Sequence, residues 1–107
     1  MATPETELLG TICEYLAYRK HFFWRSNNIP APFSKDGEMH FRAMPKYSRK
    51  GVPDICLIKD GFFIGLEVKP KGKYQSQDQK DFEHDLKDAG AEYYVIHSIE
   101  ELKEIGL

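Results

Sequence analysis

Residues 51–69, GVPDICLIKDGFFIGLEVK, hold the pattern that decides the fold. An apolar run at 55–58 and a second arm at 62–69, apolar through residue 66, flank the Asp-Gly dipeptide at 60–61. Asp-Gly is a preferred two-residue turn of type I′ between antiparallel strands. We therefore expect a β-hairpin whose register is set by this turn.

This register brings two acidic side chains together. It sets Asp54 directly opposite Glu67, with Cβ atoms about 5 Å apart, and Lys69 follows on the same face as Glu67. Like charges placed opposite one another repel, and a divalent cation with hard oxygen ligands, Mg²⁺ or Mn²⁺, removes the conflict. The alternative is an exposed cluster at a sheet edge in which Lys69 only neutralises Glu67.

The remaining elements follow from periodicity, caps and turn residues. The pattern predicts a helix from residue 4 to about 19 or 20 capped by Thr3, a loop over 27–37, a strand over 39–44, a helix capped by Ser76 and ended by Gly90, a strand over 93–96, and a short helix capped by Ser98. The order is αβββαβα. It indicates an α/β fold with a mixed sheet flanked by helices.

Length and composition place limits on the class of protein. The chain has 107 residues, 41% hydrophobic, which predicts one domain over 1–107. It has no apolar run of the roughly 20 residues that a membrane span needs, and its start does not resemble a signal peptide. Cys13 and Cys56 form neither a disulfide framework nor a zinc-ligand pattern. We expect a reduced, cytoplasmic protein without a membrane partner.

The net charge of −2 conceals a strong asymmetry. Residues 19–50 carry eight basic and two acidic side chains, whereas residues 81–107 carry two basic and eight acidic ones. A basic middle segment suits a polyanionic partner. The alternative reading is a solvated, charged surface.

The motifs together resemble a known family. They are G-x-P-D at 51–54, E-V-K at 67–69, a K-x-G-x-x-x-S-x-x-Q pattern spread over an extra residue or so at 69–79, and Gly-Ala-Glu-Tyr at 90–93. The first two spell the PD-(D/E)xK signature of restriction-endonuclease-like nucleases. The ordered combination resembles the virus-type replication-repair nuclease (VRR-NUC) family, in its stand-alone phage and bacterial form. The resemblance covers nearly the whole chain and implies a restriction-endonuclease-like core.

The resemblance also implies the roles of the central residues. Asp54 and Glu67 would ligate Mg²⁺ or Mn²⁺, with the backbone carbonyl of Val68 as a further ligand. Lys69 would be the catalytic lysine.

Two further site residues are implied by the resemblance. Glu7 would be the acid of the first helix, supporting the metal directly or through water, although Glu5 and Glu14 remain alternatives. Gln79 would lie near the active site. Ser76 and Gln79 also fit a capping box, in which Gln79 satisfies a backbone amide.

The expected function is hydrolysis of DNA phosphodiester bonds. Because a chain this short has no separate domain for reading a sequence, recognition of branched DNA is favoured, and a homodimer would act on four-way (Holliday) junctions by analogy with resolvases of the same superfamily. A flap-cleaving nuclease and a non-catalytic nucleic-acid-binding module are the alternatives. The expected phosphate contacts are Arg42, Lys46, Arg49, Lys50, Lys71 and Lys73.

Overall fold

The computed structural model describes residues 3–26, 32–35, 37–41 and 45–107. Arg42, an expected phosphate contact, lies outside these residues. The elements in chain order are α1 (Pro4–Tyr18), β1 (Phe22–Arg25), β2 (Pro32–Lys35), β3 (Glu38–Phe41), β4 (Ile55–Lys59), β5 (Phe62–Val68), α2 (Gln77–Asp88), β6 (Glu92–Ile96) and α3 (Ile99–Glu104).

Four strands form the main sheet in the order β1-β4-β5-β6. The β4–β5 hairpin is antiparallel, with Lys59 opposite Phe62 and Ile55 opposite Leu66, so the predicted register is confirmed. Asp60 and Gly61 both have positive φ, as a type I′ turn requires. β1 pairs antiparallel with β4, and β6 pairs parallel with β5, which makes the sheet mixed. The α/β fold with a mixed sheet flanked by helices is therefore confirmed.

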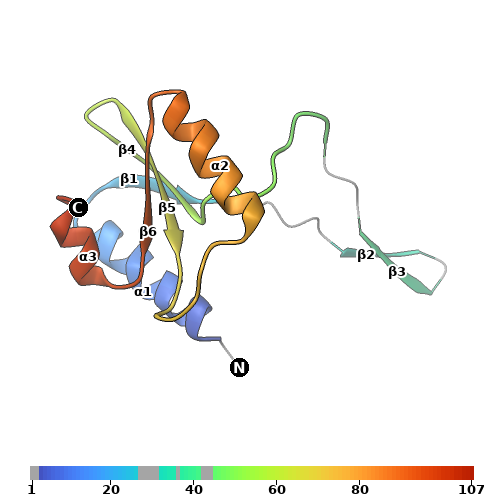
Figure 1. Cartoon of the computed structure of the whole chain (residues 1–107). Coiled ribbons are helices and arrows are strands. Elements are labelled where there is room, and N and C mark those ends of the chain that lie inside the picture. The colour runs from blue at the N-terminus through green and yellow to red at the C-terminus, as the bar shows by residue number, and fades with distance from the viewer. Residues whose placement is uncertain (1–2, 27–31, 36, 42–44) are drawn as a thin grey trace.

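Helices cover the two faces of this sheet, and Figure 1 shows α1 and α2 on opposite sides of it. Ile12 of α1 and Leu102 of α3 join Leu66 of β5 in one buried core. Leu86 of α2 lies against Gly65 on the other face, where a Cβ on the glycine would come 3.2 Å from it. Because side chains alternate along a strand, Glu67 and its neighbour Asp54 belong to the face of Gly65.

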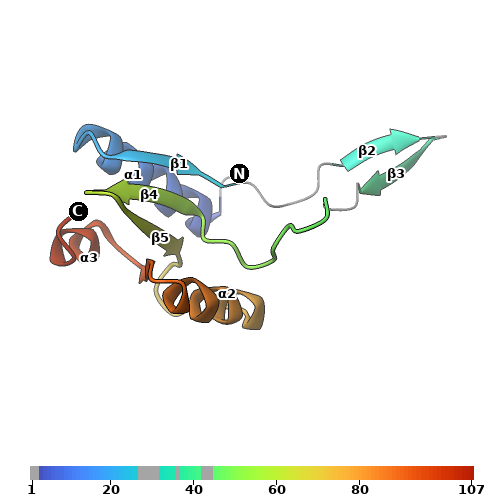
Figure 2. The same ribbon diagram turned by 90° about the horizontal axis from the view of Figure 1, so that it is seen from above.

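The second sheet consists of β2 and β3 alone. The two strands pair antiparallel, from Pro32 opposite Phe41 to Lys35 opposite Glu38. Figures 1 and 2 both show this hairpin projecting away from the main sheet and its helices. None of the helices in the described part of the chain has the length and apolar character to span a bilayer.

The predicted order αβββαβα is wrong in the first half of the chain. β1 was not expected, and β2 occupies part of the predicted loop over 27–37. β3 begins at Glu38, one residue before the expected strand over 39–44, whose last three residues lie outside the described ones. β1 and β2 are four residues long and lack the alternation of apolar and polar residues that marks a longer strand.

The helix caps are confirmed. The side chains of Thr3, Ser76 and Ser98 each accept a hydrogen bond from a backbone amide in the first turn of their helix. Ser76 and Gln79 form a reciprocal capping box. These contacts fix where each helix begins.

Gly51 packs the start of the decisive stretch against α2. It has a φ of +78°, and a Cβ at this position would lie 2.2 Å from the backbone oxygen of Asp78. Both the backbone conformation and the close approach therefore require glycine. This contact holds the segment that leads into Pro53 and Asp54.

We predict that Gly51→Ala lowers the free energy of unfolding by at least about 2 kcal/mol. The backbone strain of an alanine at positive φ adds to the steric overlap of its Cβ with the backbone of Asp78. Urea denaturation measures the change. Gly10→Ala is the matched control, since a Cβ on Gly10 would meet no atom within 4 Å. In a helix this control should gain up to about 1 kcal/mol. Equal stability of wild-type protein and Gly51→Ala would contradict the packing described.

Candidate metal and active site

Three carboxylates converge at the end of the hairpin away from its turn. Glu5, Asp54 and Glu67 each offer an oxygen, and these oxygens lie within 4.8 Å of one another. Glu5 comes from the first turn of α1, Asp54 immediately precedes β4, and Glu67 lies near the end of β5. Residues far apart in the sequence therefore form one acidic cluster.

Backbone contacts hold Asp54 in place. The amide of Ser26 donates to the carbonyl oxygen of Asp54 at 2.9 Å, and the Ser26 hydroxyl donates to the carbonyl oxygen of Pro53. On the other side, the amide of Val68 donates to Oδ2 of Asp54 at 2.8 Å. The chain beyond β1 thus fixes the Asp54 backbone, while β5 fixes its carboxylate.

Glu67 is buried without a hydrogen-bond partner. Its relative exposure is 1%, and neither carboxylate oxygen has a partner among the described residues. Burial, and then the neighbouring Asp54, raise the pKa of Glu67 from 4.5 to about 9. At neutral pH the isolated chain therefore keeps a proton on this carboxyl group.

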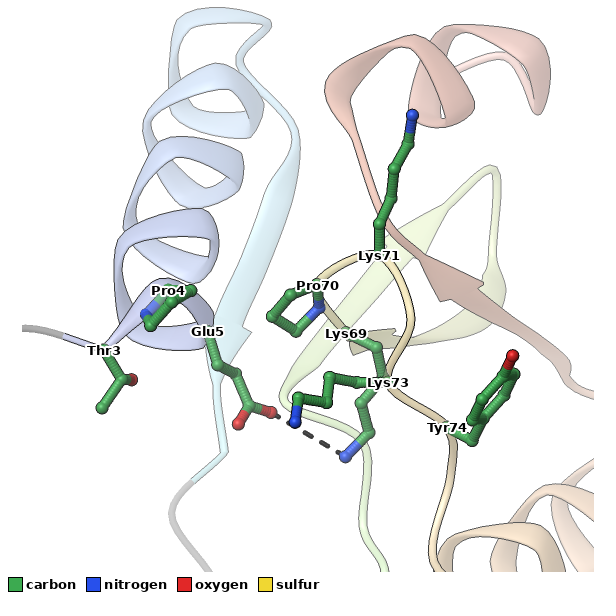
Figure 3. A pocket seen from close by; sticks show the side chains of 8 residues that line it. All are labelled: Thr3, Pro4, Glu5, Lys69, Pro70, Lys71, Lys73 and Tyr74. Carbon is green, nitrogen blue, oxygen red and sulfur yellow. Dashed lines mark ion pairs between the residues drawn. The ribbon is translucent and has the colours of Figure 1, made fainter.

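Lys69 lies two residues after Glu67, on the same side of the chain, and faces the acidic cluster. Its Nζ lies 3.9 Å from Oε1 of Glu5, and its backbone amide donates to the carbonyl oxygen of Ile96 at 3.0 Å. Figure 3 shows Glu5 and Lys69 extending toward one another. The site therefore combines three acids with one partly buried ammonium group.

Among the acids of α1, the cluster contains Glu5 and not Glu7, the acid that the resemblance implied. All three glutamates are exposed, but neither Glu7 nor Glu14 belongs to the carboxylate cluster found among the described residues. Helix periodicity explains the difference, because Glu5 lies seven residues before the buried Ile12 and so shares its face. Glu7 is two residues further along the helix, which turns it to a different side. The apolar spacing of α1 thus held the signal that favoured Glu5.

Gln79 serves as a helix cap. Its Oε1 accepts a hydrogen bond from the Ser76 amide at 2.8 Å, as the capping-box alternative predicted. Another glutamine contacts a strand residue: Nε2 of Gln75 donates to the Tyr93 hydroxyl at 3.1 Å and to Glu83 at 3.0 Å. Burial raises the pKa of Tyr93, and the charge of Glu67 adds to the effect. Gln75 belongs to none of the sequence motifs described above.

The expected phosphate contacts fall into different settings. Arg49 pairs with Asp85 at 2.7 Å and stacks over the ring of Phe82, which ties it to α2. Lys46 lies 5.2 Å from the centre of the Tyr47 ring. The other described contacts, like Lys46 and Arg49, are exposed to solvent, namely Lys50, Lys71 and Lys73.

The donor set fits a hard divalent cation. Mg²⁺ and Mn²⁺ prefer carboxylate oxygens, and an unpartnered buried carboxylate is satisfied by a cation as well as by a proton. Asp54, Glu67 and Glu5 would hold it. A ligand role for the Val68 carbonyl stays a prediction.

Comparison with protein-family models, with curated proteins and with solved structures found no match for this chain. The resemblance to the VRR-NUC family and the restriction-endonuclease-like core therefore remain predictions from the motifs.

We predict that Glu67→Gln stabilises the metal-free chain at neutral pH. The pKa of Glu67 is about 9 when folded and 4.5 when unfolded. Between these values the folded chain holds one more proton, so its stability falls as pH rises. The glutamine variant lacks this loss, and its free energy of unfolding should exceed that of the wild type by about 3 kcal/mol at pH 7.

Urea denaturation in EDTA from pH 5 to 8.5 measures this effect. The difference between Glu67→Gln and wild type should widen as pH rises. Glu104→Gln, an exposed glutamate on α3, is the matched control and should follow the wild type. A difference that stays constant with pH would show that Glu67 is not the titrating group.

Proposed function

We propose that the chain is a metal-dependent DNA endonuclease that hydrolyses phosphodiester bonds. The observation that carries the proposal is the buried, unpartnered carboxylate of Glu67 beside Asp54. A buried carboxylate without a hydrogen-bond partner destabilises the folded chain, and such groups are rare in folded proteins. Perturbed titratable groups of this kind cluster at functional sites.

The acidic residues and the lysine of the site would have different roles. Asp54, Glu67 and Glu5 would hold Mg²⁺ or Mn²⁺. When bound, such a cation polarises a phosphate oxygen and makes a bound water easier to deprotonate. The Lys69 ammonium group would donate to the attacking water or to a non-bridging phosphate oxygen.

The reaction needs no covalent intermediate with the protein. The water oxygen forms the new bond to phosphorus, the bond from phosphorus to one ester oxygen breaks, and that oxygen takes up a proton. The motif pattern placed no serine or cysteine as a nucleophile, and the exposure of Cys13 and Cys56 is low.

Branched DNA is the proposed substrate, with a four-way junction as its leading form. Lys71 and Lys73 are the expected phosphate contacts that line a pocket together with Glu5 and Lys69, and they lie on the loop that follows Lys69. A flap nuclease would use the same chemistry on a different DNA shape. A binding module would keep the affinity for DNA and lack hydrolysis.

We predict cleavage of branched DNA in Mg²⁺ or Mn²⁺ and none in EDTA. Labelled single strand, duplex, flap, fork and immobile four-way junction are incubated with the protein, and the products are resolved on denaturing gels. Asp54→Asn and Lys69→Ala should each lower the rate by at least about 100-fold, as expected for loss of a metal ligand or of a group that stabilises charge.

Lys103→Ala is the matched control, because Lys103 is exposed on α3. Paired symmetric cuts in the junction support the resolvase form, and cuts in flaps alone replace it with the flap nuclease. Equal cleavage by wild-type, Asp54→Asn and Lys69→Ala proteins would overturn the assigned site. DNA binding without hydrolysis in either metal would favour the binding module.

We propose that the active form is a homodimer, and an aromatic cluster on the edge of the main sheet supports this. Phe22 and Trp24 of β1 are 69% and 45% exposed, and their rings lie 6.0 Å apart. Phe63 of β5 lies 6.4 Å from Trp24. β1 is an edge strand of the main sheet in the part of the chain that the structure describes. Two copies of such an edge are self-complementary about a two-fold axis.

We predict that Trp24→Arg converts a dimer into a monomer by placing charge in the centre of this contact. Sedimentation velocity measures the change in mass. Tyr18→Arg, at an exposed position on α1, should leave the mass unchanged. A wild-type protein that sediments as a monomer at tens of micromolar would refute the dimer proposal.

A further inference from the structure

A pocket of about 480 Å³ adjoins the acidic cluster. The start of α1 lines one side with Thr3, Pro4 and Glu5, and the loop between β5 and α2 lines the other with residues 69–71, 73 and 74. Figure 3 shows the side chains of Lys69 and Lys73 extending toward Glu5, with Tyr74 further along the loop. Since Glu5 and Lys69 belong to both the pocket and the site, the two are continuous.

Hydrogen bonds hold the loop that builds this pocket. The amide of Lys73 donates to the carbonyl oxygen of Pro70 at 3.1 Å, closing a turn. Beyond the pocket, Gln75 is anchored to Tyr93 of β6 and to Glu83 of α2. The loop is therefore tied at both ends before any ligand arrives, which lowers the entropic cost of binding.

The lining combines positive charge with an aromatic ring. Three lysines and a single acid, Glu5, line the pocket. Figure 3 shows Lys69 and Lys73 extending toward Glu5, whereas Lys71 extends away from it. Tyr74 is 85% exposed, so its ring contributes little to the folded core. Ammonium groups bind phosphate, and an exposed aromatic ring offers a surface on which a base can stack.

We infer that this pocket binds one unpaired nucleotide of the DNA strand, with its phosphate at the lysines and its base stacked on Tyr74. The inference rests on the proposed nuclease function and specifies its substrate class. The strand next to the cleaved bond must carry a base that is free of its duplex neighbours. A nick, gap, flap or junction branch point supplies such a base.

Two features favour one nucleotide over a continuous duplex. The volume lies at the small end of the range for pockets that hold compact organic ligands. In a continuous duplex, neighbouring bases cover both faces of every base, so the Tyr74 ring could stack only after a base had left the helix. Unstacking costs a few kcal/mol, and DNA that already carries an unpaired base avoids that cost.

Fluorescent oligonucleotides test the inference without hydrolysis. One duplex carries a single unpaired 2-aminopurine at a flap junction, and the other carries the same base paired within a continuous duplex. Binding is measured in EDTA by fluorescence quenching and anisotropy. We expect the wild-type protein to quench the unpaired base and to bind its duplex more tightly.

Substitutions at Tyr74 separate stacking from charge. Tyr74→Ala should weaken binding of the unpaired-base duplex by about 5- to 150-fold, the loss of one base–aromatic stack. It should leave the continuous duplex nearly unchanged. Tyr74→Phe should behave as wild type. Tyr18→Ala is the control, since Tyr18 is equally exposed at the far end of α1, about 20 Å along the helix.

The lysines should act differently. Lys71→Ala and Lys73→Ala should weaken both duplexes alike and each lower the salt dependence of binding by about one counterion. Tyr74→Ala binding that is unchanged, or weakened equally for both duplexes, would overturn the inference.

The binding and cleavage experiments together distinguish failure of the nucleotide pocket from failure of the proposed nuclease function. Loss of selective binding, with cleavage that still depends on Asp54 and Lys69, refutes the nucleotide pocket alone. Selective binding that depends on Tyr74, with no cleavage in Mg²⁺ or Mn²⁺, refutes the nuclease and retains the pocket.

Discussion

The burial of the Glu67 carboxylate beside Asp54 is the constraint on which the site depends. The β4–β5 register forces the two residues together, and the packing around β5 keeps water from Glu67. The isolated chain satisfies this carboxyl group with a proton. A divalent cation would have to displace that proton, so cation affinity is expected to rise with pH toward the pKa of Glu67. Under the proposed function, stability and cation binding would therefore be coupled through one side chain.

The neighbouring elements supply what the hairpin lacks. Ser26, just beyond β1, holds the backbone of Asp54, and the parallel pairing with β6 holds the backbone of Lys69. The first turn of α1 adds Glu5, at a helix terminus that favours negative charge. Each of the three therefore approaches the end of the hairpin from a different side. This explains why a chain of 107 residues can assemble the cluster without a second domain.

The sequence predicts the hairpin and the helix caps because their signals are local. An Asp-Gly turn fixes a register, and Ser76 with Gln79 fixes the start of a helix, within a few residues of chain. Local signals do not predict β1, because its pairing with β4 joins segments about thirty residues apart. Pairs of this kind depend on tertiary packing rather than on intrinsic preference. Asp54, Glu67 and Lys69 were predictable because they lie in or beside the hairpin, whose signal is local. β1 was not predictable because its pairing with β4 is long-range.

The choice between Glu5 and Glu7 shows where a motif and a physical pattern diverge. Motif spacing favoured Glu7, whereas the apolar face of α1 that buries Ile12 also carries Glu5. A helix packed through that face can bring to the sheet only residues that share it. The basic residues show the same dependence on position. Arg49, from the basic middle segment, is paired with Asp85. The positive charge beside the acidic cluster comes instead from the loop after Lys69, outside that segment. The position of a side chain on its element, more than the charge of its segment, therefore decides whether it reaches the site.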